Sequence, residues 1–344
     1  MSLRYKNILY TVILLLAVFL VWKYRKSQQV PMGYLTGKTM GPITYNVKYF
    51  DPNTQHYQTQ VDSLLKVFNQ SLNTYIPESE ISGFNRDSAF TFQLPFFYPV
   101  LKRSQEIYNM TSGAFDPTVM PVINAWGFGP EKEIKKDSAY LDSLMTFVGF
   151  NNIDFNEKQV WKKDRRAELD FSAVAKGYGV DEVAHYLEDK GIENLFVEIG
   201  GEVYAKGKNL QKDTFWSVGI LDPNSDELNQ FYYAIVTLEN KAMATSGNYF
   251  NYHIIDSVKY GHTIDPTTGF PIVHSLLSAS IFADDCMTAD AVATACMVMG
   301  VEKSKAFFNE HPEMDAFLIY TDKDGNMQSY ATPGIKDKIE KVEQ

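Results

Sequence analysis

Asp290 and Thr294 are the clearest candidates for metal chemistry in the sequence. They lie four residues apart in Thr288–Met299, a segment whose pattern predicts a helix, so their side chains share one helical face. A carboxylate and a hydroxyl are hard oxygen donors that suit Mg²⁺ alongside ligand phosphates and water. A structural interpretation stays open, because an acidic residue in the first turn of a helix also complements the helix macrodipole.

A second candidate site begins where a predicted short strand, Leu169–Phe171, turns into a predicted helix over residues 173–189. Ser172 is placed to cap this helix, and Lys176 falls in its first turn. A helix N-terminus offers free N–H groups and positive partial charge, which favour phosphate. The match to a dinucleotide fingerprint is poor, because Glu182 stands where a third glycine belongs. The alternative interpretation is a surface lysine on a capped helix.

The third candidate is His262, which lies just before a predicted tight turn at Asp265–Gly269. Histidine gains and loses a proton near neutral pH, as a general base must, although a single histidine is often structural. The tripeptide Asp-Pro-Thr occurs in this turn and also at residues 116–118. Trp126 and Phe128 follow the first copy, where they could stack on a planar ring or belong to the core.

The amino-acid composition excludes several classes of protein. Aromatic residues make up 14% of the 344-residue chain and hydrophobic residues 45%, which is enough to bury a large core and excludes disorder. Two cysteines exclude a disulfide scaffold and a cysteine-rich zinc protein. Beyond residue 30 the chain carries 27 basic and 42 acidic residues, a net charge of −15. Such an acidic body excludes nucleic acid as a partner, because phosphate contacts need Lys and Arg.

The amino terminus carries a candidate membrane-targeting segment. Ile8 to Trp22 is a run of 15 residues without charge, with basic residues on both sides. No small-residue cleavage site ends the run, so we expect an uncleaved signal anchor over residues 1–26. A cleaved signal peptide and a buried soluble helix are the alternatives, since 15 residues is short for a span of about 20. Residues 27–38 are polar and predict a tether, and residues 39–335 predict the folded body.

The pattern of the body mixes strands and helices without strict alternation, which indicates an α+β fold. The predicted helices are Val61–Tyr75, Tyr98–Met110, 137–148, 173–189, Thr288–Met299 and 302–310. The predicted strands are Thr44–Phe50, Leu169–Phe171, Leu195–Ile199, Phe215–Leu221, Tyr232–Leu238, Leu277–Phe282 and 315–320. We expect Phe215–Leu221 and Tyr232–Leu238 to pair with each other.

The order of these segments resembles the ApbE family of flavin transferases (FAD:protein FMN transferases) over about residues 39–330. The segments that carry the resemblance are Met40-Gly41, Tyr75–Ser82, Gly113–Thr118, Asn124–Phe128, Asp170–Asp181, Ile199–Gly201, Ala244–Gly247, His262–Gly269 and Ala289–Ala291 with Thr294. Each segment is weakly informative by itself, whereas their combination in this order is specific.

The resemblance implies an α+β fold with two lobes and the active site between them. It implies Mg²⁺-dependent cleavage of the FAD pyrophosphate, transfer of FMN to a threonine or serine of an acceptor protein, and release of AMP. The implied acceptors belong to flavin-dependent redox complexes, such as respiratory pump subunits. By analogy the body lies on the periplasmic, extracytoplasmic side. Family members are often anchored through a lipid-modified cysteine, whereas no cysteine follows the apolar run here.

The resemblance also assigns roles residue by residue. His262 matches the proposed catalytic base, and Asp290 and Thr294 match metal ligands, with the backbone carbonyl of Ala173 as a third. The positions that match FAD contacts are Met40, Tyr75, Ala114, Phe115, Asp116, Asp170, Lys176 and Ile264.

Two other functions compete with the transferase. The first is a Mg²⁺-dependent FAD pyrophosphatase that gives FMN and AMP, which differs only in whether water replaces the acceptor. The second is a non-enzymatic periplasmic flavin-binding protein. The presence of Lys176, His262, Asp290 and Thr294 argues against the second, because a binding protein does not need both a base and a metal site.

Overall fold

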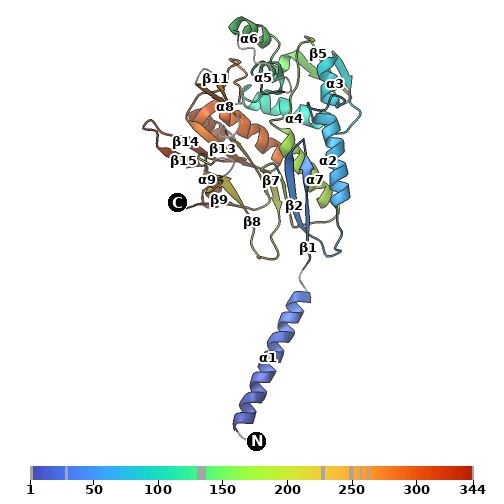
Figure 1. Ribbon diagram of the computed structural model, residues 1–344, viewed down its shortest axis with the longest axis vertical. Helices are drawn as coiled ribbons and strands as arrows, with labels where there is room; N and C mark the ends of the chain where they lie inside the picture. Colours follow the sequence, from blue (N-terminus) through green and yellow to red (C-terminus); the bar gives the residue numbers. More distant parts are fainter. Residues whose placement is uncertain are drawn as a thin grey trace.

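The computed structural model of this chain describes residues 3–27, 30–129, 137–225, 229–247, 252–255, 258–261 and 263–342. Figure 1 shows a body of sheets and helices from which helix α1 (Leu3–Ser27) stands apart. The other α-helices are α2 (Gln58–Leu72), α3 (Glu80–Arg86), α4 (Phe97–Met110), α5 (Met120–Ala125), α6 (Ser138–Met145), α7 (Ala175–Glu188), α8 (Cys286–Glu310) and α9 (Pro333–Lys336). Short 3₁₀ turns are η1 (Pro117–Val119) and η2 (Phe150–Asn152).

The strands form one large sheet and several small ones. The large sheet has the order β1-β2-β6-β7-β10-β13-β14-β15, with antiparallel pairing throughout. Its strands are β1 (Met32–Thr39), β2 (Ile43–Phe50), β6 (Leu195–Ile199), β7 (Glu202–Lys206), β10 (Lys241–Gly247), β13 (Leu276–Ala283), β14 (Asp315–Thr321) and β15 (Met327–Ala331). The smaller sheets join β3 (Ala89–Thr91), β5 (Gln159–Lys162) and β4 (Ile153–Phe155); β16 (Ile339–Lys341), β9 (Tyr232–Leu238) and β8 (Trp216–Leu221); and β11 (Tyr252–Ile255) with β12 (Val258–Gly261).

The central strands of the large sheet are buried on both faces, and alternate residues of such a strand belong to different cores. On β13, Ile281 packs into the core beneath α7 and α8, whereas Phe282 packs toward the β16-β9-β8 sheet. On β14, Leu318 and Phe317 divide in the same way. The large sheet therefore holds helices on one face and a small sheet on the other.

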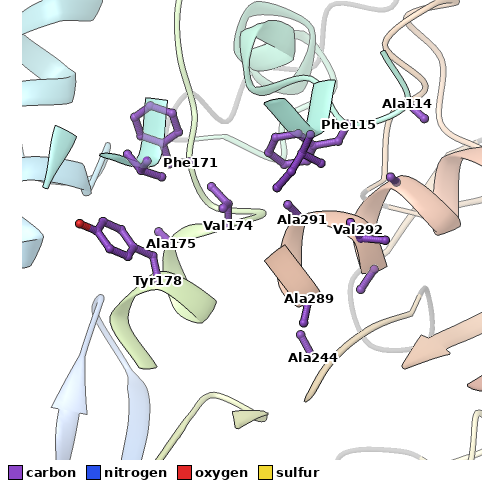
Figure 2. Packing of buried hydrophobic residues seen from close by; sticks show 14 of the residues in the cluster. Ala114, Phe115, Phe171, Val174, Ala175, Tyr178, Ala244, Ala289, Ala291 and Val292 are labelled. Carbon is purple, nitrogen blue, oxygen red and sulfur yellow. The ribbon is translucent and has the colours of Figure 1, made fainter. Parts of the chain in front are cut away.

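Helices α7 and α8 pack directly against each other on that sheet. Figure 2 shows small side chains where they meet: Val174 and Ala175 at the start of α7, with Ala289 and Ala291 of α8 and Ala244 of β10 in one cluster. Small side chains let backbones approach closely, so functional groups on the two helices come within reach of each other.

Gly177 marks a point where the two helices approach closely. A Cβ atom there would lie 2.2 Å from the Cys286 carbonyl oxygen and 2.8 Å from the Asp290 Cβ. We expect Gly177→Ala to lower stability by about 1–3 kcal/mol, because overpacking exceeds the gain in helix propensity. Thermal unfolding checks this, with His185→Ala on the exposed face of α7 as the control. An unchanged melting temperature for Gly177→Ala would contradict the close contact.

Most predicted elements are confirmed within a few residues, and the mixture of strands and helices confirms the α+β class. Strand β6 and helix α4 fall almost exactly where the pattern placed them, and β8 pairs with β9 as expected. One element, α8, spans both helices predicted around Gly300, whose φ of 73° breaks the helical conformation at the predicted boundary. The division into two lobes stays a prediction.

Three predictions about local structure are wrong. Residues 32–38 of the predicted tether 27–38 belong to β1, which pairs with β2. Leu169–Phe171 form no strand, because both the N–H and the carbonyl of Leu169 bond to the Asn85 side-chain amide instead of a neighbouring strand. Ser172 does not cap α7, since its N–H and hydroxyl bond to the Asp170 carboxylate.

Residues 3–26 of the predicted signal anchor, residues 1–26, belong to helix α1. Within the part of the chain that the structure describes, no helix has both the length and the apolar character needed to cross a membrane.

Candidate active site

A cavity of about 640 Å³ opens beside the N-terminal end of α7 and the first turns of α8. Its volume falls in the range of sites for small molecules and cofactors. Eleven of the twelve predicted site residues line it: Met40, Tyr75, Ala114, Phe115, Asp116, Asp170, Ala173, Lys176, Ile264, Asp290 and Thr294. The twelfth, His262, lies outside the described residues, although its neighbours Thr263 and Ile264 line the cavity. The structure thus brings together residues from most of the length of the chain.

The polar end of the cavity contains Asp290 and Thr294 of α8. Asp290 Oδ2 accepts a hydrogen bond of 3.0 Å from the Gly177 N–H, which fixes the carboxylate against α7. The Thr294 hydroxyl lies 3.3 Å from the Ser246 hydroxyl at the end of β10. The predicted i, i+4 spacing therefore places both oxygen donors toward one space.

Lys176 lies at the same end and is shared by two carboxylates. Its Nζ contacts Glu202 Oε1 closely and lies 3.6 Å from Asp290 Oδ1. Burial disfavours the ammonium, but the charges of Asp290 and Glu202 outweigh burial and raise the pKa of Lys176. Burial in turn raises the pKa of Glu202, against the attraction of Lys176. Lys176 therefore stays cationic, which suits a site for phosphate.

The start of α7 only partly matches the expected phosphate-binding helix terminus. Its N-cap residue, Val174, makes no side-chain capping bond. However, the Ala175 N–H donates to the Phe171 carbonyl and the Gly177 N–H to Asp290. These two N–H groups therefore already have partners within the protein.

The remaining wall of the cavity is largely apolar. Phe68, Leu72 and Phe115 line it from the core, and Tyr75, 65% exposed, lies at its rim. Met40 lines it from the turn between β1 and β2 with a φ of 48°, an uncommon conformation for a bulky residue. Strained residues of this kind concentrate at functional sites. An apolar wall with one charged end suits a ligand that has a planar ring and a phosphate.

The two Asp-Pro-Thr copies fold in the same way on the border of the cavity. In each, one aspartate oxygen accepts both the N–H and the hydroxyl of the threonine: Asp116 from Thr118, and Asp265 from Thr267. Trp126, which follows the first turn in the chain, donates from Nε1 to the Gly269 carbonyl in the second turn at 2.9 Å. This hydrogen bond connects the two regions. The repeated tripeptide is therefore a repeated turn, and Trp126 is a core residue.

Asp116 is almost fully buried, and burial raises its pKa to about 6 although the two bonds from Thr118 oppose the shift. We expect Asp116→Asn to stabilise the ligand-free protein by up to about 3 kcal/mol at pH 7, because the buried charge is removed and the acceptor for Thr118 is kept. The raised pKa favours the native state fully below about pH 4, and this contribution is lost as the pH rises through 6.

The advantage of Asp116→Asn should therefore grow from pH 4 to pH 6 and stay constant above it. Urea unfolding of both proteins at several pH values measures it. A difference in stability that does not change with pH would contradict the raised pKa.

Asp170 connects the first Asp-Pro-Thr turn with the segment that leads into α7. Its N–H donates to the Pro117 carbonyl at 2.8 Å, and its carboxylate accepts from Ser172. Burial raises the pKa of Asp170, while the bonds from Ser172 oppose the shift. Asp170 thus lines the cavity, and Ser172 is the hydrogen-bond partner of its carboxylate.

The residues at the polar end fit a hard divalent cation of the Mg²⁺ type. Within the described ranges, no group of three or more His, Cys, Asp or Glu side chains could hold a metal ion. The donors that the structure places at this end are the Asp290 carboxylate and the Thr294 hydroxyl, and Ala173 lines the same cavity. Asp290 Oδ1 accepts no hydrogen bond from the described residues, and the charges of Asp290, Glu202 and Lys176 leave a net negative charge for a cation.

Sequence reasoning missed two polar residues of this end. Ser246 belongs to the quoted segment Ala244–Gly247, and its place at the end of β10 brings it beside Thr294. Glu202 follows the Gly200-Gly201 turn, and only the pairing of β6 with β7 directs it toward Lys176. No local signal in the sequence marks Glu202, because both its burial and its approach to Lys176 depend on this pairing.

The fold and the cavity define the class of protein. It is an α+β protein with a cavity that has an apolar wall and a charged end, and this end suits phosphate and a divalent cation. The chain belongs to the ApbE family, whose sequence model matches residues 40–318. This confirms the resemblance of the motifs.

Named relatives agree with this placement. The chain is 37% identical to the FAD:protein FMN transferase of Vibrio cholerae serotype O1 over 319 residues, 90% of this chain and 93% of the relative. It is 37% identical to the FAD:protein FMN transferase of Haemophilus influenzae over 302 residues, 84% of this chain and 86% of the relative. Its fold is similar to the solved structure of the flavin transferase ApbE from Vibrio cholerae, with a TM-score of 0.80, 35% identity, and 90% and 100% of the two chains covered.

Proposed function

We propose that this protein is an FAD:protein FMN transferase, an enzyme that moves FMN from FAD to a hydroxyl of an acceptor protein and releases AMP. The proposal rests on one observation: Lys176, Asp290 and Thr294 line the polar end of the same cavity whose remaining wall is apolar. The names of the relatives support the same activity.

In the proposed mechanism the apolar wall orients the flavin end of FAD and Lys176 holds a pyrophosphate oxygen by charge. His262 takes the proton from the threonine or serine hydroxyl of the acceptor. That oxygen then attacks the phosphorus of the FMN portion, and the bond to AMP breaks. General-base assistance of this kind contributes about 10²–10⁴ in rate.

Mg²⁺ is the metal we propose, held by Asp290, Thr294 and the Ala173 carbonyl, where it would withdraw charge from the phosphates. On the protein side, the Gly177 N–H fixes the orientation of the Asp290 carboxylate. Ser246 stands beside the Thr294 hydroxyl and can fix its direction.

The test incubates the purified chain with FAD and Mg²⁺, with and without a threonine-bearing acceptor domain, and follows AMP and protein mass together. AMP with an FMN-sized mass gain on the acceptor is the expected result. AMP without that gain on any acceptor tried would favour the pyrophosphatase. Stable stoichiometric flavin without AMP would favour the flavin-binding protein.

We also propose that α1 holds the body at a membrane, on the periplasmic side, where acceptors in flavin-dependent redox complexes lie. In support, large apolar side chains of α1 are exposed between Tyr5 and Leu20, including Leu9 and Leu14. The full chain should sediment with membranes, and a chain that begins at Val30 should be released into the soluble fraction. Equal distribution of both chains would contradict this role of α1.

A further inference from the structure

Glu202 is a buried acid at the start of β7 whose role the proposed chemistry does not assign. Its side chain is 3% exposed, and Oε1 contacts the Lys176 ammonium. The other oxygen, Oε2, has no hydrogen-bond partner in the described part of the chain. A buried carboxylate oxygen without a partner costs free energy, so packing alone does not explain the Glu202 side chain.

The ammonium of Lys176 is shared unequally between its two acids. It is in close contact with Glu202, whereas Asp290 Oδ1 lies 3.6 Å away, beyond the roughly 2.7–2.9 Å of a charge-assisted hydrogen bond. The other oxygen of Asp290 is held by the Gly177 N–H. Asp290 Oδ1 is therefore oriented but not neutralised by a hydrogen bond.

We propose that Glu202 is a positioning residue that keeps the Lys176 ammonium away from Asp290 Oδ1 and so leaves this oxygen for a divalent cation. The inference deepens the proposed function, on which it rests, because it concerns the cation of the same site. Glu202 itself does not line the cavity, so it acts through Lys176.

The physical argument compares the site with and without the Glu202 charge. With it, two carboxylates share one ammonium, and the cluster keeps one negative charge for the cation. Without it, Lys176 has one acidic partner left and closes the gap to Asp290. A cation must then displace an ammonium group from its ligand, and the local charge is zero. Changes to residues that orient metal ligands typically weaken metal affinity about 10–100-fold.

The test measures Mn²⁺ binding to the full chain without FAD, from the paramagnetic resonance signal of free Mn²⁺. Glu202→Gln should weaken binding about tenfold or more. Glu202→Asp keeps the charge but is one methylene shorter, so Lys176 is released and binding should weaken as well. In a Lys176→Met background, Glu202→Gln should have a much smaller effect, because no ammonium is left to position.

Unchanged Mn²⁺ affinity in Glu202→Gln would overturn the inference. The same loss in both backgrounds would also overturn it, because Glu202 would then act only as a distant charge. Wild-type affinity in Glu202→Asp, or no Mn²⁺ binding by the wild-type chain, would overturn it too. Thermal unfolding without metal shows that each variant is folded. The wild-type FAD assay separates the two proposals: Mn²⁺ binding in the expected pattern without AMP release would contradict the function and leave the inference standing.

Discussion

Asp290→Asn is expected to lower the rate of FMN transfer by about 10²-fold or more and to abolish its dependence on Mg²⁺. A metal ion that polarises a phosphoryl oxygen stabilises the transition state by several kcal/mol, and each 1.36 kcal/mol is a factor of about ten in rate. Asparagine is a sharp probe because its carbonyl oxygen can still accept the bond from the Gly177 N–H, so mainly the charge is lost.

The matched control is Asp285→Asn, five residues earlier in the chain. Asp285 caps α8 through the Thr288 N–H and does not line the cavity. Because asparagine caps a helix about as well as aspartate, this variant should keep the fold and the wild-type Mg²⁺ titration. An Asp290→Asn protein with an unchanged Mg²⁺ titration would remove Asp290 from the metal site.

His262→Ala is expected to lose FMN transfer by about 10²–10⁴-fold and to keep the wild-type affinity for FAD. The reason is that a base acts on the acceptor hydroxyl and contributes to the transition state, whereas FAD is held by the cavity wall. Equilibrium FAD binding and single-turnover transfer separate the two effects. His185→Ala, on the exposed face of α7, is the control and should leave both measurements unchanged. A variant of His262 with wild-type turnover would exclude it as the base.

The candidate site could be predicted to the extent that its residues lie in recognisable local patterns. The spacing of Asp290 and Thr294 is a property of one helix, so the sequence is sufficient to place them together. Glu202 is different, because its approach to Lys176 depends on the register of β6 with β7 and on the packing of α7 over that hairpin. Such long-range geometry has no local signature.

The fold errors have physical reasons of the same kind. Residues 32–39 have the glycine content of a tether, but a Cβ at Gly33 would lie 2.2 Å from the Tyr49 ring, and one at Gly37 would lie 2.6 Å from the Tyr45 ring. These glycines allow β1 to cover two buried tyrosines of β2, and single-sequence patterns cannot distinguish this from flexibility. At Leu169 the apolar pattern predicts a strand, whereas the pairing partner is the Asn85 side chain.

The start of β1 at Met32 limits how far the folded body can lie from the end of α1. A flexible tether over residues 27–38 would let the body range about 40 Å from the end of its anchor, since an extended residue spans about 3.3–3.6 Å. Helix α1 ends at Ser27 and the sheet begins at Met32, so the four residues between them reach only about 14 Å. If α1 lies in a membrane as proposed, the catalytic body works close to the bilayer surface. Acceptors must then present their threonine at a height set by the fold of the transferase.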